Sequence, residues 1–502
     1  MSPSSDRSAS TTAWLVSATM VVTVMMIGLD RMVLNVALPK MTEDFGVDTD
    51  TVAWLATGYI LADAVFVPTA AKLADIMGNR RVLIWAVIGF LVTSIMCALA
   101  WSFETLLVSR ILQGLFGAAV YPTTLTIITR TDFASTSQRN AAIGIWSAAM
   151  GVSAILGPLA GGPLIDLFSW RAIFWMNVPV SALALVLTLL LLPRERWTLG
   201  GIRGLDWWGT AVLTVALTAF VLVVEKGEDW GWTSSGALFL YAVTVAAGIA
   251  FYRYELGHPD PVVDPKLLGN TALVISLGVT FVSFGGLMGA MYLIPTFAQV
   301  WMSYSSTRTG FLLAPMAISM VAVTPISVYL QARLPTSRVV AISMVIAAGG
   351  MFLLSGLDAR TGALDVILPL MVMSAGLGIG LGPLTTAATD AVARSQVSTA
   401  SGLVSLTRNL AGAVCVAVFG TIYNGSTENN VISLAGGSTV NDPAMMATGA
   451  QMLVTKASID AFGDVFLVAA GMLLVAAAAA MFLRRAPGAS QRRPEEALLP
   501  AH

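Results

Sequence analysis

The chain alternates between apolar stretches of about 20 residues and polar connections that are mostly short. An α-helix needs about 20 residues to cross the roughly 30 Å hydrocarbon core of a membrane. Stretches of this length lie near residues 13–38, 51–71, 82–101, 105–127, 141–164, 171–192, 207–224, 236–253, 272–299, 309–330, 338–356, 364–388, 399–421 and 463–483. The pattern therefore predicts an all-α membrane protein with fourteen transmembrane helices.

Composition supports this assignment, because charged residues are scarce. Of the 502 residues, 56% are hydrophobic and 11% are charged, against about 25% charged in ordinary soluble domains. So few charges do not cover a soluble surface. The formal net charge of −1 leaves no basic face to neutralise phosphates, which argues against nucleic acid as a partner.

Residue types that bind metals or form catalytic groups are sparse and scattered. Cys97 and Cys415 lie in separate apolar stretches, His258 lies in a loop and His502 ends the chain. This spacing predicts neither a disulfide framework nor a metal site. No Gly-rich loop ends in Gly-Lys-Ser/Thr, so no ATP site is expected either. We expect no cofactor and no enzymatic centre.

The basic residues predict the orientation of the chain in the membrane. Eighteen Lys and Arg lie in loops and tails on the side shared by the two termini, against six on the other side. Cytoplasmic loops are enriched in these residues. We therefore expect a multi-pass protein of the cell membrane with both termini in the cytoplasm, and a first apolar stretch that is retained as a span.

A weak internal repeat relates the fourth and twelfth apolar stretches. Gly117, Pro122 and Thr124 have the same spacing as Gly378, Pro383 and Thr385. Many transporters are built from such repeats and bind their substrate between the repeats, near the middle of the membrane. The repeat predicts two six-helix halves that flank an inserted pair of helices.

The predicted domain boundaries follow from this division. They are an N-terminal tail at 1–12, a first half at 13–192, an inserted two-helix segment at 193–254, a second half at 255–484 and a C-terminal tail at 485–502. Within the second half, residues 422–462 are polar and rich in Gly, Ser and Asn, so we expect a long outer loop. A short interfacial helix near 444–459 is an alternative for part of it.

Asp30, Arg31, Asp63 and Arg110 are charged residues that lie inside apolar stretches. Intramembrane charges are costly and usually functional. At 1.5 Å per residue, Asp30 and Asp63 lie about 13 and about 18 Å from the outer ends of their helices, so they are expected to share one cavity. We predict that the four residues couple transport to protons, and that Arg31 keeps its carboxylate partner ionised. Alternatives are an Arg110 that reaches the outer surface and an Asp63 that is merely satisfied by a neighbouring helix.

Two further segments suggest moving parts. Asp75, Gly78, Arg80 and Arg81 join the second and third stretches and predict a conformational latch at the cytoplasmic side, with an ordinary basic loop as the alternative. The fifth stretch is dense in small residues that let backbones touch, and its proline bends the helix. Its marked residues are Gly151, Gly157, Pro158, Gly161 and Gly162. A plain packing interface is the alternative for this helix.

These segments resemble the signatures of the major facilitator superfamily, and the fourteen spans resemble its drug/proton antiporter family. Two further motifs carry the resemblance: the first stretch reads Leu-Asp30-Arg-Met-Val-Leu-Asn-Val-Ala-Leu-Pro39, and Trp170-Arg-Ala-Ile-Phe-Trp-Met-Asn177-Val-Pro179 enters the sixth. The thirteenth stretch contributes Ala400-Ser-Gly402 through Arg408 and Gly412.

The resemblance implies proton-driven export, because the Gly-Pro-rich fifth span marks antiporters in that family. It favours Asp30 as the proton carrier, since the family match falls on this residue. The chain departs from the family at Ala71, Ile76 and Met32, and neutral residues replace the acids that some relatives carry in the tenth and thirteenth spans. These departures favour neutral or monocationic substrates.

Together these features predict a secondary active transporter that exports small lipophilic compounds, as in multidrug efflux and antibiotic resistance. Alternatives are a dedicated exporter of a lipid or secondary metabolite, and a proton-coupled nutrient symporter. Candidate substrate contacts are aromatic and sulfur side chains: Tyr59, Phe66, Phe116, Tyr121, Trp146, Met288 and Tyr292. We expect a monomer whose partners are its substrate, protons and membrane lipids.

Overall fold

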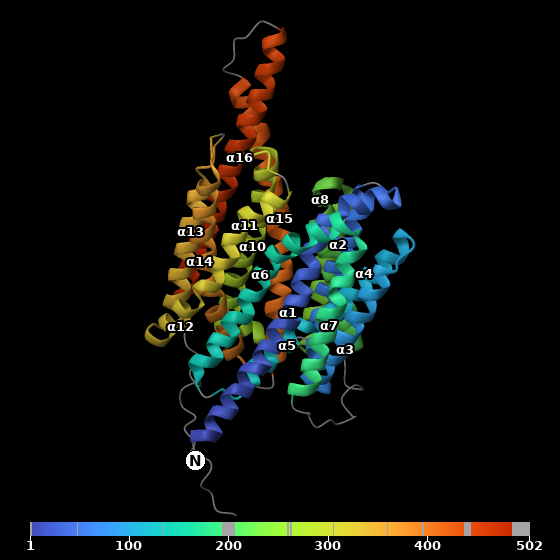
Figure 1. Ribbon diagram of the computed structural model, residues 1–502, viewed down its shortest axis with the longest axis vertical. Coiled ribbons are helices and arrows are strands. Elements are labelled where there is room, and N and C mark those ends of the chain that lie inside the picture. The colour runs from blue at the N-terminus through green and yellow to red at the C-terminus, as the bar shows by residue number, and fades with distance from the viewer. Residues whose placement is uncertain are drawn as a thin grey trace, which may run out of the picture.

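The computed structural model is built almost entirely of α-helices (Figure 1). It describes residues 3–47, 49–133, 135–192, 206–258, 261, 264–304, 306–358, 360–393, 396–435 and 443–483. The predicted C-terminal tail at 485–502 and most of the connection before residue 206 lie outside these residues. We call the end of the bundle where the first helix begins and the last helix ends the termini end, and the opposite end the distal end.

The helices fall into a first group, an intervening pair and a second group. The first group contains α1 (Pro3–Phe45), α2 (Thr49–Met77), α3 (Asn79–Ala98), α4 (Phe103–Gly117), α5 (Val120–Arg130), α6 (Thr136–Leu167) and α7 (Arg171–Leu191). The pair is α8 (Trp207–Trp230) and α9 (Ser235–Glu255). The 3₁₀ turn η2 (Pro265–Gly269) precedes the second group: α10 (Thr271–Val300), α11 (Ser306–Ala322), α12 (Thr324–Arg333), α13 (Thr336–Leu354), α14 (Ala363–Asp390), α15 (Val397–Ala435) and α16 (Pro443–Ala480).

We refer to α1–α7 as the first half, to α10–α16 as the second half, and to the boundary between them as the seam. Contacts across the seam join α6 to α11 and α14, and α15 to α2 and α5. Helix α8 packs against both α2 and α15, one from each half, while α9 packs on α8. The intervening pair therefore lies beside the seam.

Two expected spans are each divided into two helices. The span expected at 105–127 is divided between α4 and α5 just before Pro122, and the span expected at 309–330 is divided between α11 and α12 just before Pro325. Proline lacks the N–H that would continue the helical hydrogen bonds and it clashes with the preceding turn. The break therefore follows from the local sequence.

Twelve helices among the described residues are long and apolar enough to cross a membrane. Helices α2 and α6 occupy the second and fifth expected positions but are not among the twelve. The count of fourteen spans stays a prediction.

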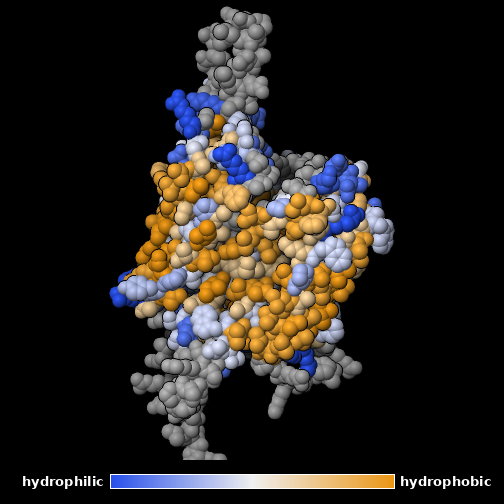
Figure 2. Space-filling model, viewed as in Figure 1, coloured by the Kyte–Doolittle hydropathy of each residue, from blue (hydrophilic) through white to orange (hydrophobic). Residues whose placement is uncertain are grey.

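The surface confirms a multi-pass membrane protein. Figure 2 shows a broad apolar band around the middle of the bundle, with hydrophilic side chains concentrated toward its two ends. Large apolar side chains such as Trp85, Leu190 and Phe352 are exposed in the structure. Exposed apolar patches of this extent mark contact with lipid or with a partner.

The outer loop expected at 422–462 differs from the structure, because both flanking helices continue into it. Helix α15 extends to Ala435 and α16 begins at Pro443, so that the two helices rise beyond the rest of the bundle (Figure 1). No proline interrupts the chain between residues 398 and 442. Low hydropathy ends a membrane span, but it does not end a helix.

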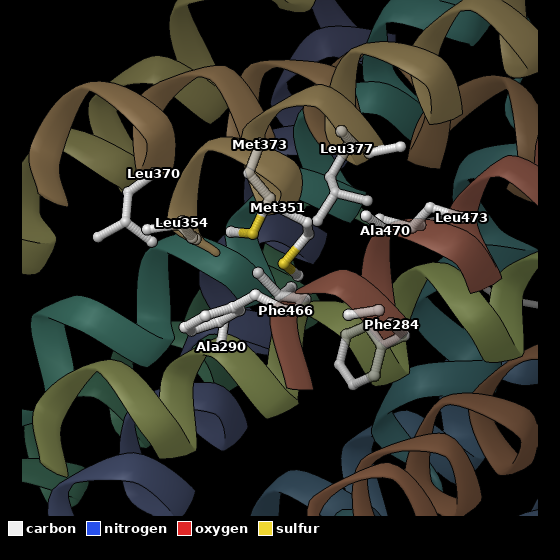
Figure 3. Close-up of a cluster of buried hydrophobic side chains, with 14 of the residues drawn as sticks. Phe284, Ala290, Met351, Leu354, Leu370, Met373, Leu377, Phe466, Ala470 and Leu473 are labelled. Atoms are coloured by element: carbon white, nitrogen blue, oxygen red, sulfur yellow. The ribbon is translucent and has the colours of Figure 1, made fainter. Parts of the chain in front are cut away.

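Each half has its own apolar core. In the second half, Phe284, Met351 and Phe466 pack with Leu370 and Leu473 between α10, α13, α14 and α16 (Figure 3). The core of the first half gathers around Met20, Phe90 and Trp146. Separate cores let each half move as a unit, with the seam as the place where contacts change.

Candidate transport site

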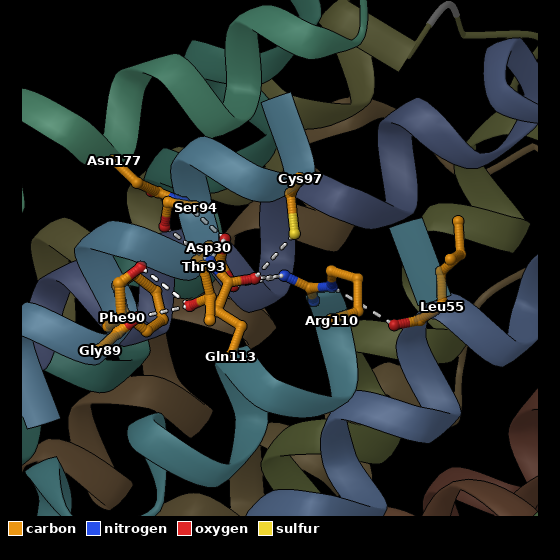
Figure 4. Close-up of polar contacts among 10 residues, drawn as sticks. All are labelled: Asp30, Leu55, Gly89, Phe90, Thr93, Ser94, Cys97, Arg110, Gln113 and Asn177. Carbon is orange, nitrogen blue, oxygen red and sulfur yellow. Dashed lines mark hydrogen bonds and ion pairs between the residues drawn. The ribbon is translucent and has the colours of Figure 1, made fainter. Parts of the chain in front are cut away.

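The first buried ion pair joins Asp30 of α1 to Arg110 of α4 (Figure 4). The Arg110 Nη1 to Asp30 Oδ2 distance is 2.7 Å, and both side chains are 1% exposed. Asn177 of α7 and Gln113 of α4 donate to Asp30 Oδ1 at 2.6 and 3.3 Å. Arg110 therefore points into the bundle and does not reach the outer surface. Every partner of Asp30 named here belongs to the first half.

Further hydrogen bonds fix this pair rigidly. The Gln113 side chain accepts from Arg110 Nη1 at 2.6 Å and donates to Ser94 of α3 at 2.8 Å. Arg110 Nε donates to the carbonyl of Leu55 in α2 at 3.4 Å. Arg110 and Gln113 are three residues apart and so share one helix face. We term Asp30, Arg110, Gln113 and Asn177 the sealed cluster.

The second ion pair joins Arg31 of α1 to Asp63 of α2, with Nη2 and Oδ2 2.5 Å apart. Asn409 of α15, in the second half, donates to Asp63 Oδ2 at 2.5 Å and accepts from Arg31 Nη1 at 3.0 Å. The Arg31 side chain is 16% exposed and that of Asp63 is 3% exposed. We term these three residues the seam cluster, because they join the two halves.

Tyr59 of α2 lies between the two clusters. Its ring centroid is 4.4 Å from Arg110 Cζ and 5.3 Å from Arg31 Cζ, so both cations contact its ring. A Cβ on Gly114 of α4 would lie 2.4 Å from the Tyr59 carbonyl oxygen, so only glycine lets α4 approach this closely. Asp30 and Asp63 thus lie in adjacent clusters, each with its own arginine.

A third arginine lies at the seam, and no carboxylate among the described residues pairs with it. Arg408 of α15 is 3% exposed, donates to the hydroxyl of Tyr121, and donates from Nη2 to Thr385 Oγ1 at 2.9 Å. The rings of Tyr121, Trp146 and Phe284 surround its guanidinium, with centroids 5.4, 5.8 and 5.9 Å from Cζ. Trp146 is held in turn by a 3.1 Å hydrogen bond to Thr124.

At the termini end, polar contacts close the seam. Asp75 Oδ1 lies 3.3 Å from Arg130 Nη2, and Asp75 Oδ2 accepts from Thr399 of the second half at 3.3 Å. Arg139 of α6 pairs with Asp390 of α14 at 2.9 Å. Burial raises the pKa of Asp75 to about 6, although Arg130 and Thr399 act in the opposite direction.

Only part of the predicted latch forms the contacts described here that close the termini end. Gly78 has φ +91°, which is the left-handed turn expected of it. Arg80 donates to the carbonyl of Leu189 in its own half at 3.1 Å. Within the segment 75–81, the bonds described here that cross the seam use Asp75 and, after the glycine, Asn79, which accepts from Ser398 at 3.2 Å.

Comparison with known proteins identifies the family. The model of the Major Facilitator Superfamily matches residues 20–416. This chain belongs to the Major Facilitator Superfamily. The resemblance noted in the sequence motifs is thereby confirmed.

Two curated relatives of this superfamily member are named for drug resistance, and the second is also named for export. The chain is 32% identical over 404 residues to the multidrug resistance protein Stp of Mycobacterium tuberculosis, which covers 79% of this chain and 73% of Stp. It is 29% identical over 522 residues to the tetracenomycin C resistance and export protein of Streptomyces glaucescens, with 97% of this chain and 94% of the relative covered.

A solved structure agrees with the fold. The proton:xylose symporter XylE bound to 6-bromo-6-deoxy-D-glucose matches with a TM-score of 0.63 at 12% identity, covering 95% of this chain and 96% of XylE. Membership of this superfamily indicates that the chain is a membrane transporter rather than an enzyme.

The predicted substrate contacts of this transporter are dispersed. Tyr121 and Trp146 contact each other and Arg408 at the seam. Phe116 packs on Gly89 of α3, away from the seam, since a Cβ on that glycine would meet the Phe116 ring at 2.2 Å. Of the others, Tyr59 lies between the two ion pairs, Phe66 and Met288 are half-buried, and Tyr292 is exposed.

The glycines of α6 bring it against α1. A Cβ on Gly157 would lie 2.7 Å from Met32 Cβ, and one on Gly161 would lie 2.1 Å from Val33 Cγ2. Gly162 faces open space. The surroundings of Gly151 and Pro158 on the same helix lie outside the described residues. The glycine-rich helix thus packs against α1 at Met32 and Val33, the two residues that follow Arg31.

Four site residues were not expected from the sequence, namely Gln113, Asn177, Arg408 and Asn409. Asn409 and Asn177 each donate to a buried aspartate, and Arg408 is the cation of the seam. Asn177 and Arg408 lie in the quoted motifs, but no role was assigned to them. Arg408, nine residues inside the stretch expected at 399–421, carried the same signal of a costly charge as Arg110.

Proposed function

We propose that this transporter is a proton-coupled antiporter that exports small lipophilic compounds across the cell membrane, with both termini in the cytoplasm. The observation that carries the proposal is the seam cluster. Here an ionisable carboxylate, Asp63, bonds to both halves at once through Arg31 and Asn409. Transport by alternating access requires that these halves separate and rejoin.

The contacts favour Asp63 over Asp30 as the group that takes up the proton. The expectation from sequence was that Arg31 would pair with one acid and leave the other as the carrier, but both acids have an arginine. Asp30 keeps all of its named partners when the halves move, because they belong to one half. Protonation of Asp63 weakens bonds to Arg31 and Asn409, and one of these bonds crosses the seam.

The proposed cycle follows from these bonds. In the structure the seam is closed at the termini end, which the proposal assigns to the cytoplasm. In this state Asp63 takes up an external proton and substrate is released. The weakened seam cluster then allows the halves to rock. Deprotonation on the cytoplasmic side restores the negative charge, and substrate binds from the cytoplasm or the inner leaflet.

The energy available is sufficient for efflux. One proton that moves inward across about 100 mV provides about 2.3 kcal/mol, and half a pH unit adds about 0.7 kcal/mol. Together they sustain a gradient of about a hundredfold for a neutral substrate. Helix α6 supports antiport through the resemblance of its Gly-Pro-rich sequence, and its Gly157 and Gly161 pack closely against α1 beside Arg31.

Two alternatives share this architecture. A dedicated exporter of one secondary metabolite is supported by the nearly full-length match to a relative named for resistance to and export of tetracenomycin C. A nutrient symporter would use a similar fold, since XylE is a proton:xylose symporter, but that likeness concerns the fold alone.

The test is transport in proteoliposomes that hold the purified chain. We expect tetracenomycin C, or at least one compound of a panel of unrelated lipophilic antibiotics, to accumulate when the lumen is more acidic than the outside. Nigericin, which collapses the pH gradient, must abolish that accumulation. Accumulation only with the opposite gradient would indicate symport, and no proton-dependent flux of any compound would contradict the proposal.

A further inference from the structure

Arg408 is a buried cation for which the described part of the chain supplies no carboxylate. Among the described residues, its hydrogen-bond acceptors are two neutral hydroxyls, those of Tyr121 and Thr385, and its buried Nε has no partner there. Aromatic rings supply the remaining contacts. Cation–π contacts and neutral acceptors are much weaker than the hydration that a buried guanidinium loses.

The balance of charge around the clusters leads to the same point. Asp30 offsets Arg110, and Asp63 offsets Arg31. Arg408 is the third arginine and has no acid of its own among the described residues, so this part of the seam holds one excess positive charge. A stable cation in a membrane requires either water or an anion.

The surroundings of Arg408 come from both halves, so they change when the seam opens. Tyr121 and Trp146 belong to α5 and α6 of the first half, whereas Thr385 and Phe284 belong to α14 and α10 of the second. At the same level, backbones of α6 and α14 touch, because a Cβ on Gly382 would lie 2.9 Å from Gly144 Cα. Separation of the halves removes the Tyr121 hydroxyl and the Trp146 ring from the guanidinium and exposes it to the space between them.

We propose that Arg408 binds an acidic group of the transported compound, such as a carboxylate, sulfonate, phenolate or enolate. A guanidinium binds planar oxyanions with two parallel hydrogen bonds. The rings of Tyr121 and Trp146 provide flat apolar surfaces for an aromatic body attached to that group. This inference rests on the proposed function and narrows its substrate class to lipophilic acids, in place of the neutral or monocationic compounds that the sequence favoured.

The position of Arg408 also links substrate to proton. Asn409, the next residue of α15, donates to Asp63 in the seam cluster. A substrate that displaces Arg408 from Tyr121 therefore acts on the turn of α15 whose next residue, Asn409, is hydrogen-bonded to Asp63 of α2. Occupancy at Arg408 and protonation of Asp63 are coupled through this turn.

The test compares two probes that differ in one group, 1-pyrenebutyrate and the neutral 1-pyrenebutanol. Binding to the full chain in nanodiscs is followed by energy transfer from tryptophan, with empty nanodiscs as the correction for partition into lipid. We expect the wild type to bind pyrenebutyrate at least tenfold more tightly than pyrenebutanol at pH 7.5. Arg408→Gln reduces this preference to less than twofold, and Arg408→Lys keeps part of it.

Arg333→Gln is the matched control, because it removes an exposed arginine that stacks on Tyr329 outside the seam, and it must keep the wild-type preference. Equal binding of the two probes by the wild type, or an unchanged preference in a folded Arg408→Gln variant, overturns the inference. If Arg408→Gln does not fold, binding of a third probe to the wild-type chain tests the inference instead. Pyrenebutyl-trimethylammonium must then bind more weakly than pyrenebutanol, and tighter binding of this cation contradicts the inference. A preference for the acid without any proton-driven flux would instead contradict the proposed function alone.

Discussion

The sealed cluster and the seam cluster use the same chemistry in two different settings. Each contains an aspartate, an arginine and an asparagine that donates to the carboxylate. In the sealed cluster the asparagine is Asn177 of α7, in the same half as Asp30, whereas in the seam cluster it is Asn409 of α15, in the opposite half. An ion pair inside one half stabilises that half, and an ion pair bonded across the seam responds to movement.

This difference separates stability from coupling. Breaking a fully buried pair leaves one charge without a partner and without water, which costs about 3–5 kcal/mol. Arg31 is partly exposed, so solvent screens part of the same loss in the seam cluster. Variants of the two clusters should therefore fail in different ways.

The largest expected effect is loss of stability in the sealed cluster. Arg110→Met leaves Asp30 buried without its cation and should lower the free energy of unfolding by about 3–5 kcal/mol, measured by denaturant titration of the purified chain in micelles. Arg31→Met should lower the free energy of unfolding by clearly less. The double variant Asp30→Asn with Arg110→Gln should recover part of the loss, and an Arg110→Met chain as stable as the wild type would contradict the comparison.

The next effect compares the two asparagines directly. Asn177→Leu removes a hydrogen bond to a carboxylate within one half and should lower stability by about 1–3 kcal/mol. Asn409→Leu removes the bond that crosses the seam and should slow proton-driven transport several-fold while stability changes less. Thermal unfolding and transport rate are measured on both variants. If the loss of stability and the loss of transport rate stand in the same ratio in Asn177→Leu and Asn409→Leu, the two clusters do not differ.

The smallest effect concerns the termini end. Because burial raises the pKa of Asp75 to about 6, ionised Asp75 disfavours the closed end above that pH. Protonation removes this penalty as the pH falls through about 6. By linkage, the equilibrium constant for closing the termini end then rises by at most about tenfold between pH 7 and pH 5.

Spin labels on Thr136→Cys and Arg333→Cys report the opening across the seam at this end, since both positions are exposed and the native Cys97 and Cys415 are buried. We expect shorter distances at pH 5 than at pH 7, and a smaller shift in the Asp75→Asn variant. A shift of full size in that variant would assign the pH response to other groups.

Sequence reasoning selected the charged residues of the site but not their pairing. Asp30, Arg31, Asp63 and Arg110 stand out because a charge inside an apolar stretch is costly. Which acid meets which arginine depends on the neighbours of α1 in space, and Asp30 finds its cation 80 residues away in α4. A single sequence does not contain that information.

Neutral and helical features were harder to predict. Asn409 carries no charge, so nothing in its stretch marks it as a ligand of Asp63. Hydropathy located the spans, but it gave no reason to expect that α15 and α16 continue through the polar region at 422–462. Helix continuity depends on backbone hydrogen bonds, whereas hydropathy reports the transfer of side chains into lipid.

The central claim is that Asp63, and not Asp30, connects proton uptake to movement of the halves. The most direct measurement compares two kinds of transport in proteoliposomes for Asp63→Asn: accumulation driven by a pH gradient, and counterflow, which exchanges substrate without a gradient. The account predicts that Asp63→Asn abolishes accumulation and keeps counterflow. Accumulation at the wild-type level in the Asp63→Asn variant would contradict this claim. So would the reverse pattern, in which a folded Asp30→Asn variant, and not Asp63→Asn, loses accumulation and keeps counterflow.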